Sequence, residues 1–152
     1  MMKTIVLSLF LAVLSVSVAA SEVVSFSASS RIKVAYFEVS FNSDPEETFV
    51  LQLTDPDKIK EARRILLNGE EAFYHFIGYV VPGETFYNPG WSFHVDTDSI
   101  DFAEISIEVC DSSAQYVEDN WEEVGGAFLP GNIWCPWSST LVRELHLYSL
   151  GL

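Results

Sequence analysis

Residues 31–53 read RIKVAYFEVSFNSDPEETFVLQL and contain two runs of β-forming residues on either side of a turn. Val, Tyr and Phe recur in both runs, which is typical of strands. Between them, Asn42-Ser43-Asp44-Pro45 has the composition of a turn. We therefore predict a hairpin of strands 31–41 and 48–53. The apolar positions change parity after Tyr36, and we expect a β-bulge there.

The following residues, 54–69, predict an amphipathic helix over 55–68. Thr54-Asp55 offers an N-cap, and Pro56 follows at a position where its missing N–H is harmless. Gly69 fits the left-handed position that ends a helix. One face of this helix is apolar at helical spacing, through Ile59, Ala62, Ile65 and Leu66.

The rest of the chain predicts more strands and one more helix. The expected strands, by apolar clustering or alternation, are 76–81, 91–95, 103–109 and 140–150. Ser112 and Gln115 form a capping box, apolar residues recur from Ala114 to Val124, and Gly125-Gly126 ends this helix. The predicted fold class is α+β, with an antiparallel-rich sheet of five or six strands and two helices packed on one face.

Composition limits the classes of partner. The chain of 152 residues carries 22 acidic and 8 basic side chains, for a formal net charge of −14. Nucleic acid is excluded as a partner, because binding it needs clustered Lys and Arg that displace counterions from phosphates. Anionic membrane surfaces are disfavoured for the same reason. The charge predicts attraction to cations or to basic proteins.

Residues 1–20 have the pattern of a secretory signal peptide. Met1–Lys3 form a positive start, Thr4–Val18 are largely apolar, and small residues precede Ser21. The apolar run is shorter than the roughly twenty residues that span a bilayer. We expect cleavage after Ala20, export to the extracellular space or a periplasm, and no membrane span in the mature chain. Residues 21–30 are then a loose lead-in to a single domain, 31–152.

The two cysteines, Cys110 and Cys135, remain in the exported product. An oxidising compartment favours a disulfide between them, and neither cysteine has the CxxC spacing of a redox motif. We expect a structural disulfide in preference to a reactive thiol.

The densest acidic segment offers the oxygen ligands that calcium prefers, through Asp96, Asp98, Asp101 and Glu104. It departs from an EF-hand loop, because the apolar Ile100 occupies the place of the third oxygen ligand. A solvated turn is the favoured interpretation, so we expect no cofactor, with calcium as the alternative. The sequence also has no G-x-S-x-G elbow and no zinc-ligand spacing among its histidines, so no catalytic residues are identified.

Aromatic residues supply the favoured binding surface. Trp134 and Trp137 flank Cys135-Pro136 in a loop, and we expect at least one of these rings to be exposed and to contact a partner. Tyr87, Trp91 and His94 are further candidate ligand-binding residues, with core packing as the alternative for Trp91.

The first predicted helix holds four of the basic residues: Lys58, Lys60, Arg63 and Arg64. A basic amphipathic helix is typical of calmodulin targets. Ion pairs at i,i+3 spacing, such as Glu61 with Arg64, explain the same charges without a partner, and we favour that interpretation.

Five motifs carry a family resemblance: FVLQLTDPDKI (49–59), YNPGWSFH (87–94), IEVCD (107–111), YVED (116–119) and GGAFLPGNIWCPWSS (125–139). In this order they resemble a family of small secreted domains described as the N-terminal domain of a calmodulin-binding protein. The resemblance implies a secreted α+β module and transfers no catalytic residues. Calmodulin is acidic and cytosolic, whereas this chain is acidic and exported, so charge and compartment both argue against calmodulin as the partner.

Two functions follow from these patterns. The favoured one is a secreted, non-enzymatic module that binds an extracellular protein or glycan through the loop of Trp134 and Trp137. The alternative is a small secreted hydrolase, or a calcium-dependent module, centred on the acidic segment from Asp96 to Glu104.

Overall fold

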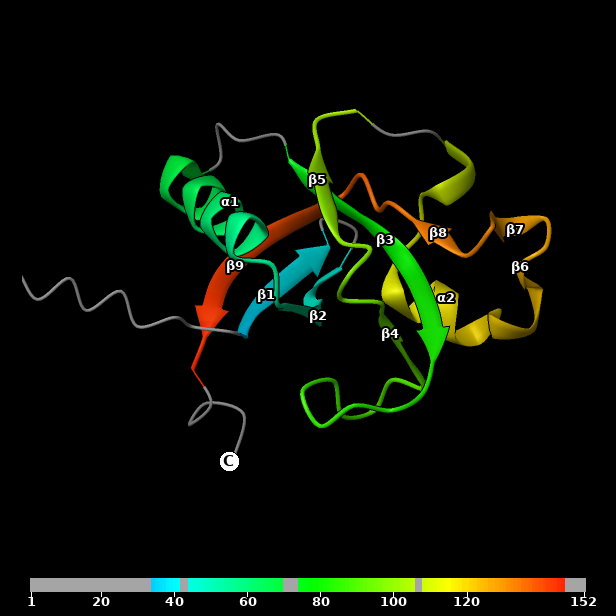
Figure 1. Cartoon of the computed structure of the whole chain (residues 1–152). Coiled ribbons are helices and arrows are strands. Elements are labelled where there is room, and N and C mark those ends of the chain that lie inside the picture. Colours follow the sequence, from blue (N-terminus) through cyan, green and yellow to red (C-terminus); the bar gives the residue numbers. More distant parts are fainter. Residues whose placement is uncertain (1–33, 42–43, 70–73, 106–107, 147–152) are drawn as a thin grey trace, which may run out of the picture. The chain divides into compact units, whose positions relative to one another are not determined.

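The computed structural model describes residues 34–41, 44–69, 74–105 and 108–146, all within the compact unit Arg31–Leu152. The predicted signal peptide and the lead-in lie outside the described residues. Within these ranges, nine strands form three sheets and two α-helices accompany them (Figure 1). None of the helices in these ranges has both the length and the apolar character to cross a membrane.

The prediction of an α+β fold, with two helices packed on one face of a single sheet, is wrong: the chain is mostly β. Helix α1 (Pro56–Asn68) packs against strands β2 and β9, but α2 (Ala114–Asp119) has only six residues. The strands between residues 90 and 138 are short and interrupted by turns, so they cannot extend one continuous ladder. Separate sheets form instead.

The predicted hairpin is confirmed as strands β1 (Ala35–Phe41) and β2 (Asp44–Leu53), which pair antiparallel. β9 (Ser139–Leu145) pairs with the other side of β1, giving the order β2-β1-β9. The register shifts lie at Ser40/Phe41 and Glu38/Val39, so the bulge expected after Tyr36 is misplaced. Tyr36 packs apart from the apolar residues of the main core, because a second small cluster covers it.

Helix α1 confirms its prediction. The Asp55 side chain accepts a hydrogen bond from the Asp57 N–H (2.8 Å), which caps the first turn, and Pro56 follows it. Ile59 and Ile65 are buried in the main core. Gly69 has a φ of 60°, a left-handed value that favours glycine and ends the helix.

The second sheet is built on β3 (His75–Pro82). Successive parts of this strand pair with β5 (Asp101–Ala103), β8 (Ile133–Trp134) and β4 (Phe93–Val95). A separate pair of very short strands, β6 (Val124–Gly125) and β7 (Phe128–Pro130), makes the third sheet. Because one strand serves three short partners, its ladder depends on contacts far apart in the sequence.

The predicted strand 103–109 ends at Ala103. Its partner there is His75, the first residue of β3, so the alternating residues beyond Ala103 have no β3 residue opposite them. Ile105 is 83% exposed. Further on, the chain forms a 3₁₀ turn, η2 (Glu108–Cys110). Alternation alone therefore predicted a strand for which the fold has no pairing edge.

The second helix is shorter than predicted. Its N-cap is Ser113, whose hydroxyl accepts a hydrogen bond from the Tyr116 N–H (3.2 Å). The helix ends at Asn120 (φ −118°), and a 3₁₀ turn, η3 (Trp121–Glu123), completes the predicted segment.

The main core is centred on Trp134, which has no exposed surface. Its ring stacks on Phe41 (centroids 5.9 Å apart) and makes edge contacts with three other phenylalanines, Phe49, Phe76 and Phe93. These rings come from β1, β2, β3 and β4, so this one side chain joins the two larger sheets.

Asn88 joins the β3–β4 connection to the first sheet. Its side-chain amide donates to the Val50 carbonyl (2.8 Å), and its oxygen accepts from the Val50 N–H (2.7 Å). Asn88 is buried, and its neighbour Tyr87 packs with Tyr36 and Val50 in the second cluster. Among the described strands β2 is an edge of its sheet, so the Asn88 amide satisfies backbone groups that no strand pairs with there.

Gly78 in β3 is expected to tolerate no side chain. A Cβ built there would lie 2.4 Å from Cγ1 of Val95, and Val95 is buried and β-branched. Gly78→Ala should lower the free energy of unfolding in urea by about 1–3 kcal/mol. The penalty should shrink in a Val95→Ala background, and an equal penalty in both backgrounds would contradict this packing.

Candidate binding surface

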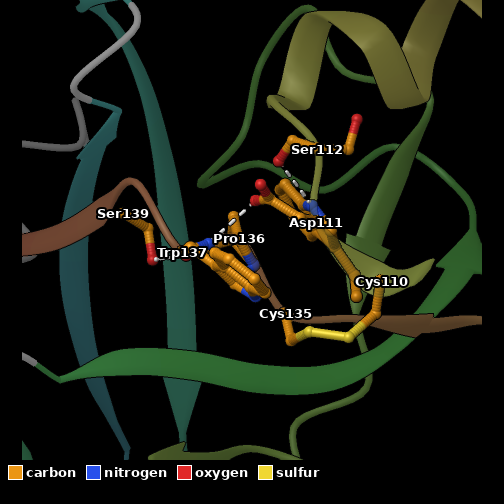
Figure 2. The surroundings of a disulfide bond; sticks show 8 residues. Cys110, Asp111, Ser112, Cys135, Pro136, Trp137 and Ser139 are labelled. Atoms are coloured by element: carbon orange, nitrogen blue, oxygen red, sulfur yellow. Dashed lines mark hydrogen bonds between the residues drawn. A yellow bond between two sulfur atoms is a disulfide. The ribbon is translucent and has the colours of Figure 1, made fainter. Parts of the chain in front are cut away.

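Two segments of the chain are tied together around the predicted disulfide (Figure 2). Cys110 and Cys135 are bonded, which confirms that prediction. The Cys135 N–H also donates to the Cys110 carbonyl (2.7 Å), and Trp134 Nε1 donates to the Ser112 carbonyl (2.9 Å). These links fix residues 110–112 against residues 134–135.

The same ties continue into the loop that carries Trp137. The Trp137 N–H donates to Oδ1 of Asp111 (2.9 Å). On the other side, the Pro136 carbonyl accepts from the Ser139 N–H (3.1 Å) and hydroxyl (2.7 Å), where β9 begins. The main chain of Trp137 is thus fixed on both sides, while 46% of the residue remains exposed.

Three exposed residues belong to the neighbouring segment, which Asp111 joins to this loop. Val109, in the η2 turn, is 56% exposed, and Glu108 and Asp111 are exposed beside it. The Asp111 N–H donates to the Glu108 carbonyl (3.2 Å), which closes the turn. We define Glu108, Val109, Asp111 and Trp137 as the Trp137 surface.

His75, at the start of β3, lies close enough to Asp111 to feel its charge. It is 6% exposed, and among the described residues its Nε2 has no hydrogen-bond partner. Burial lowers the pKa of His75 below its ordinary value of 6.5, while the negative charge of Asp111 opposes that shift. The buried imidazole is therefore neutral at pH 7.

This histidine predicts a loss of stability on acidification. The folded state binds the proton less readily than the unfolded state, so its contribution is complete above pH 6.5 and is lost as the pH falls below that value. Unfolding in urea should require less denaturant about one pH unit below that value than at neutral pH, and His75→Phe should reduce that difference. An identical pH dependence in both proteins would contradict the prediction.

The other predicted ligand-binding residues have structural positions. Trp134 is in the core, so of the two loop tryptophans only Trp137 reaches the surface. Tyr87 is 5% exposed, and Trp91 is partly buried with its ring 6.0 Å from those of Phe49 and Phe93. His94 Nδ1 lies 2.9 Å from the Gly83 carbonyl oxygen.

The acidic segment forms the turn between β4 and β5. Asp96 Oδ1 accepts from the Asp98 N–H (3.1 Å), and Asp101 pairs with Lys58 of α1. This ion pair lowers the pKa of Asp101 and raises that of Lys58. Glu104 is exposed. Across the residues described, no three carboxylate, His or Cys side chains gather into a possible metal site.

Sequence reasoning missed Glu108, Val109 and Asp111 as surface residues. The prediction of a strand over 103–109 placed Val109 on an apolar, inward face. The signal that was available is the motif IEVCD, which places Asp111 directly after a disulfide cysteine.

Comparison with known families agrees with these structural roles. A family model for the N-terminal domain of a calmodulin-binding protein family matches residues 33–148, and no match was found among curated proteins or solved structures. The motifs of the resemblance include residues that fix the fold: Asn88 on Val50, Glu118 on the Ser92 N–H (2.9 Å), and Asp111 on Trp137. The chain therefore belongs to this family of N-terminal domains, the one that its motifs resemble.

Proposed function

We propose that this chain is a secreted, non-enzymatic binding module that holds an extracellular protein partner at the Trp137 surface. Export is supported by the signal-peptide pattern of residues 1–20. The observation that carries the binding role is a half-exposed tryptophan on a main chain fixed by a disulfide and hydrogen bonds.

Rigidity is what makes this ring suitable as an anchor. Tryptophan is among the residues that dominate protein interfaces, because one ring buries a large apolar area. A partner that contacts Trp137 loses little additional loop entropy, since the loop is already fixed on both sides. Val109 extends the apolar contact on the neighbouring segment.

The family name suggests calmodulin, and the packing of α1 argues against it for the folded domain. Calmodulin binds the apolar face of an amphipathic helix. In α1 that face, with Ile59, Ala62 and Ile65, is buried in the core. Arg63 is also bound to Glu144 of β9 by two hydrogen bonds (2.6 and 2.8 Å). Calmodulin would have to pull α1 off the sheet.

The test compares two exposed aromatic residues. Trp137→Ala should reduce capture of partners from the medium of the secreting cells at least about tenfold, because it removes the anchor. Phe86→Ala is the matched control: Phe86 is 52% exposed in the β3–β4 connection and should leave capture unchanged. Both variants should keep the wild-type circular dichroism. Equal capture by wild type and Trp137→Ala would refute the proposal.

A further inference from the structure

Positive charge is absent from a long part of the sequence. Residues 65–142 contain no Lys or Arg, yet they hold thirteen of the 22 acidic residues. This stretch supplies β3, β4, β5, η2, α2 and the loop of Trp137. Its acidic side chains can therefore be compensated by Lys or Arg only from the segments before or after it.

Those cations are largely used elsewhere. In the described ranges, Lys58 pairs with Glu61 and Asp101, Arg63 with Glu144 (2.6 Å), and Arg143 with Glu38 (2.8 Å). Arg64 lies 4.0 Å from Glu61 and over the Tyr74 ring. Asp101 is thus the one acidic residue of the stretch that forms a salt bridge within the described part of the chain.

The Trp137 surface combines this uncompensated charge with exposed apolar area. Val109 and Trp137 supply the apolar contact, and Glu108 and Asp111 form no salt bridge to any described residue. A carboxylate at the rim of an interface selects partners by charge and repels acidic ones. An apolar centre with an acidic rim is complementary to an apolar segment flanked by Lys or Arg.

We infer that the partner is a cationic polypeptide segment, whose Lys or Arg side chains meet Glu108 and Asp111 while an apolar side chain covers Trp137. This inference rests on the proposed function and narrows it to one class of partner. It distinguishes the site from a glycan platform, because stacking of a neutral sugar on tryptophan would depend little on ionic strength.

The experiment uses the mature chain and charge-matched variants. The probe is a short fluorescent peptide of alternating Arg and Leu, and fluorescence anisotropy measures its affinity over a series of salt concentrations. Glu108→Gln with Asp111→Asn removes two charges from the surface, and Asn keeps an oxygen that can accept from the Trp137 N–H. The control, Glu84→Gln with Asp98→Asn, removes two charges from exposed residues of the same Lys- and Arg-free stretch.

The expected result is position-dependent. The surface variant should bind the peptide about tenfold more weakly and show a reduced salt dependence, since each rim charge contributes somewhat under one factor of ten. The control should change affinity less than about twofold. Trp137→Ala should also weaken binding, and a Gly-for-Leu version of the peptide should bind wild type more weakly than the original peptide does.

Two results would overturn the inference. If both double variants weaken binding equally, the attraction belongs to the net charge and not to the Trp137 surface. If the peptide binds without salt dependence or not at all, while Trp137→Ala still abolishes capture of the natural partner, the cationic class is wrong and the proposed function stands. Loss of the Trp137→Ala effect on natural capture refutes the proposed function separately.

Discussion

Trp134→Ala should lower the free energy of unfolding by about 3–5 kcal/mol, the largest effect of any single substitution considered for this chain. Trp134 is fully buried, and its ring contacts Phe41 of β1, Phe49 of β2 and Phe93 of β4. Truncation would leave a large cavity where the two larger sheets meet. It would also leave the Ser112 carbonyl without its indole donor (2.9 Å).

The measurement is equilibrium unfolding in urea, followed by far-ultraviolet circular dichroism. Trp134→Phe is the control, because it keeps an aromatic ring but removes the hydrogen bond to Ser112. It should fall between wild type and Trp134→Ala. A loss below about 1 kcal/mol for Trp134→Ala would show that this ring is not the centre of the core.

Removal of the Cys110–Cys135 disulfide should lower the free energy of unfolding by about 3.5 kcal/mol by the chain-entropy model, for a sequence separation of 25 residues. The physical reason is that the bond restricts the unfolded chain. Cys110→Ala with Cys135→Ala should therefore unfold at lower urea concentration than the oxidised wild type. Wild type in reductant should behave like the double variant.

The same double variant tests the link between the disulfide and the binding surface. The hydrogen bonds from Trp134 to Ser112 and from Trp137 to Asp111 do not involve sulfur. At urea concentrations where it remains folded, the variant should keep part of its affinity for the partner. Unchanged stability in the double variant would contradict the predicted role of the bond.

The first half of the domain was predictable because its signals are local. The hairpin of β1 and β2 follows from two β-rich runs around a short turn, and α1 follows from a cap, a proline and a helical repeat of apolar residues. Each feature lies within a few residues of the backbone that it shapes. The position of the bulge was not local in this way, because Tyr36 packs in a cluster that a distant loop completes.

The second half was not predictable in the same way. β3 pairs with three short strands, one of them far along the chain at Ile133–Trp134, so no local pattern indicates where each pairing stops. Residues 103–109 alternate clearly in sequence, yet the strand ends at Ala103, because β3 begins at the residue opposite it. Partner availability, which a single sequence does not show, decided the outcome.

The candidate surface shows the same limit at the scale of two residues. Trp134 and Trp137 lie three positions apart around Cys135-Pro136, yet one is fully buried and the other is 46% exposed. The difference arises from the contacts that hold this segment, including the hydrogen bonds to Ser112 and Asp111. Aromatic composition therefore located the loop, and only the tertiary contacts identified the exposed ring.

Asn88 has a consequence for how the protein behaves at high concentration. A strand that ends a sheet can template pairing with a second molecule, which is a common route to fibrils. At Val50 the amide of Asn88 already occupies both backbone groups that such pairing would need. A side chain thus acts as a stopper on the growing ladder, and a chain with this device can remain dispersed without another strand to cover its border.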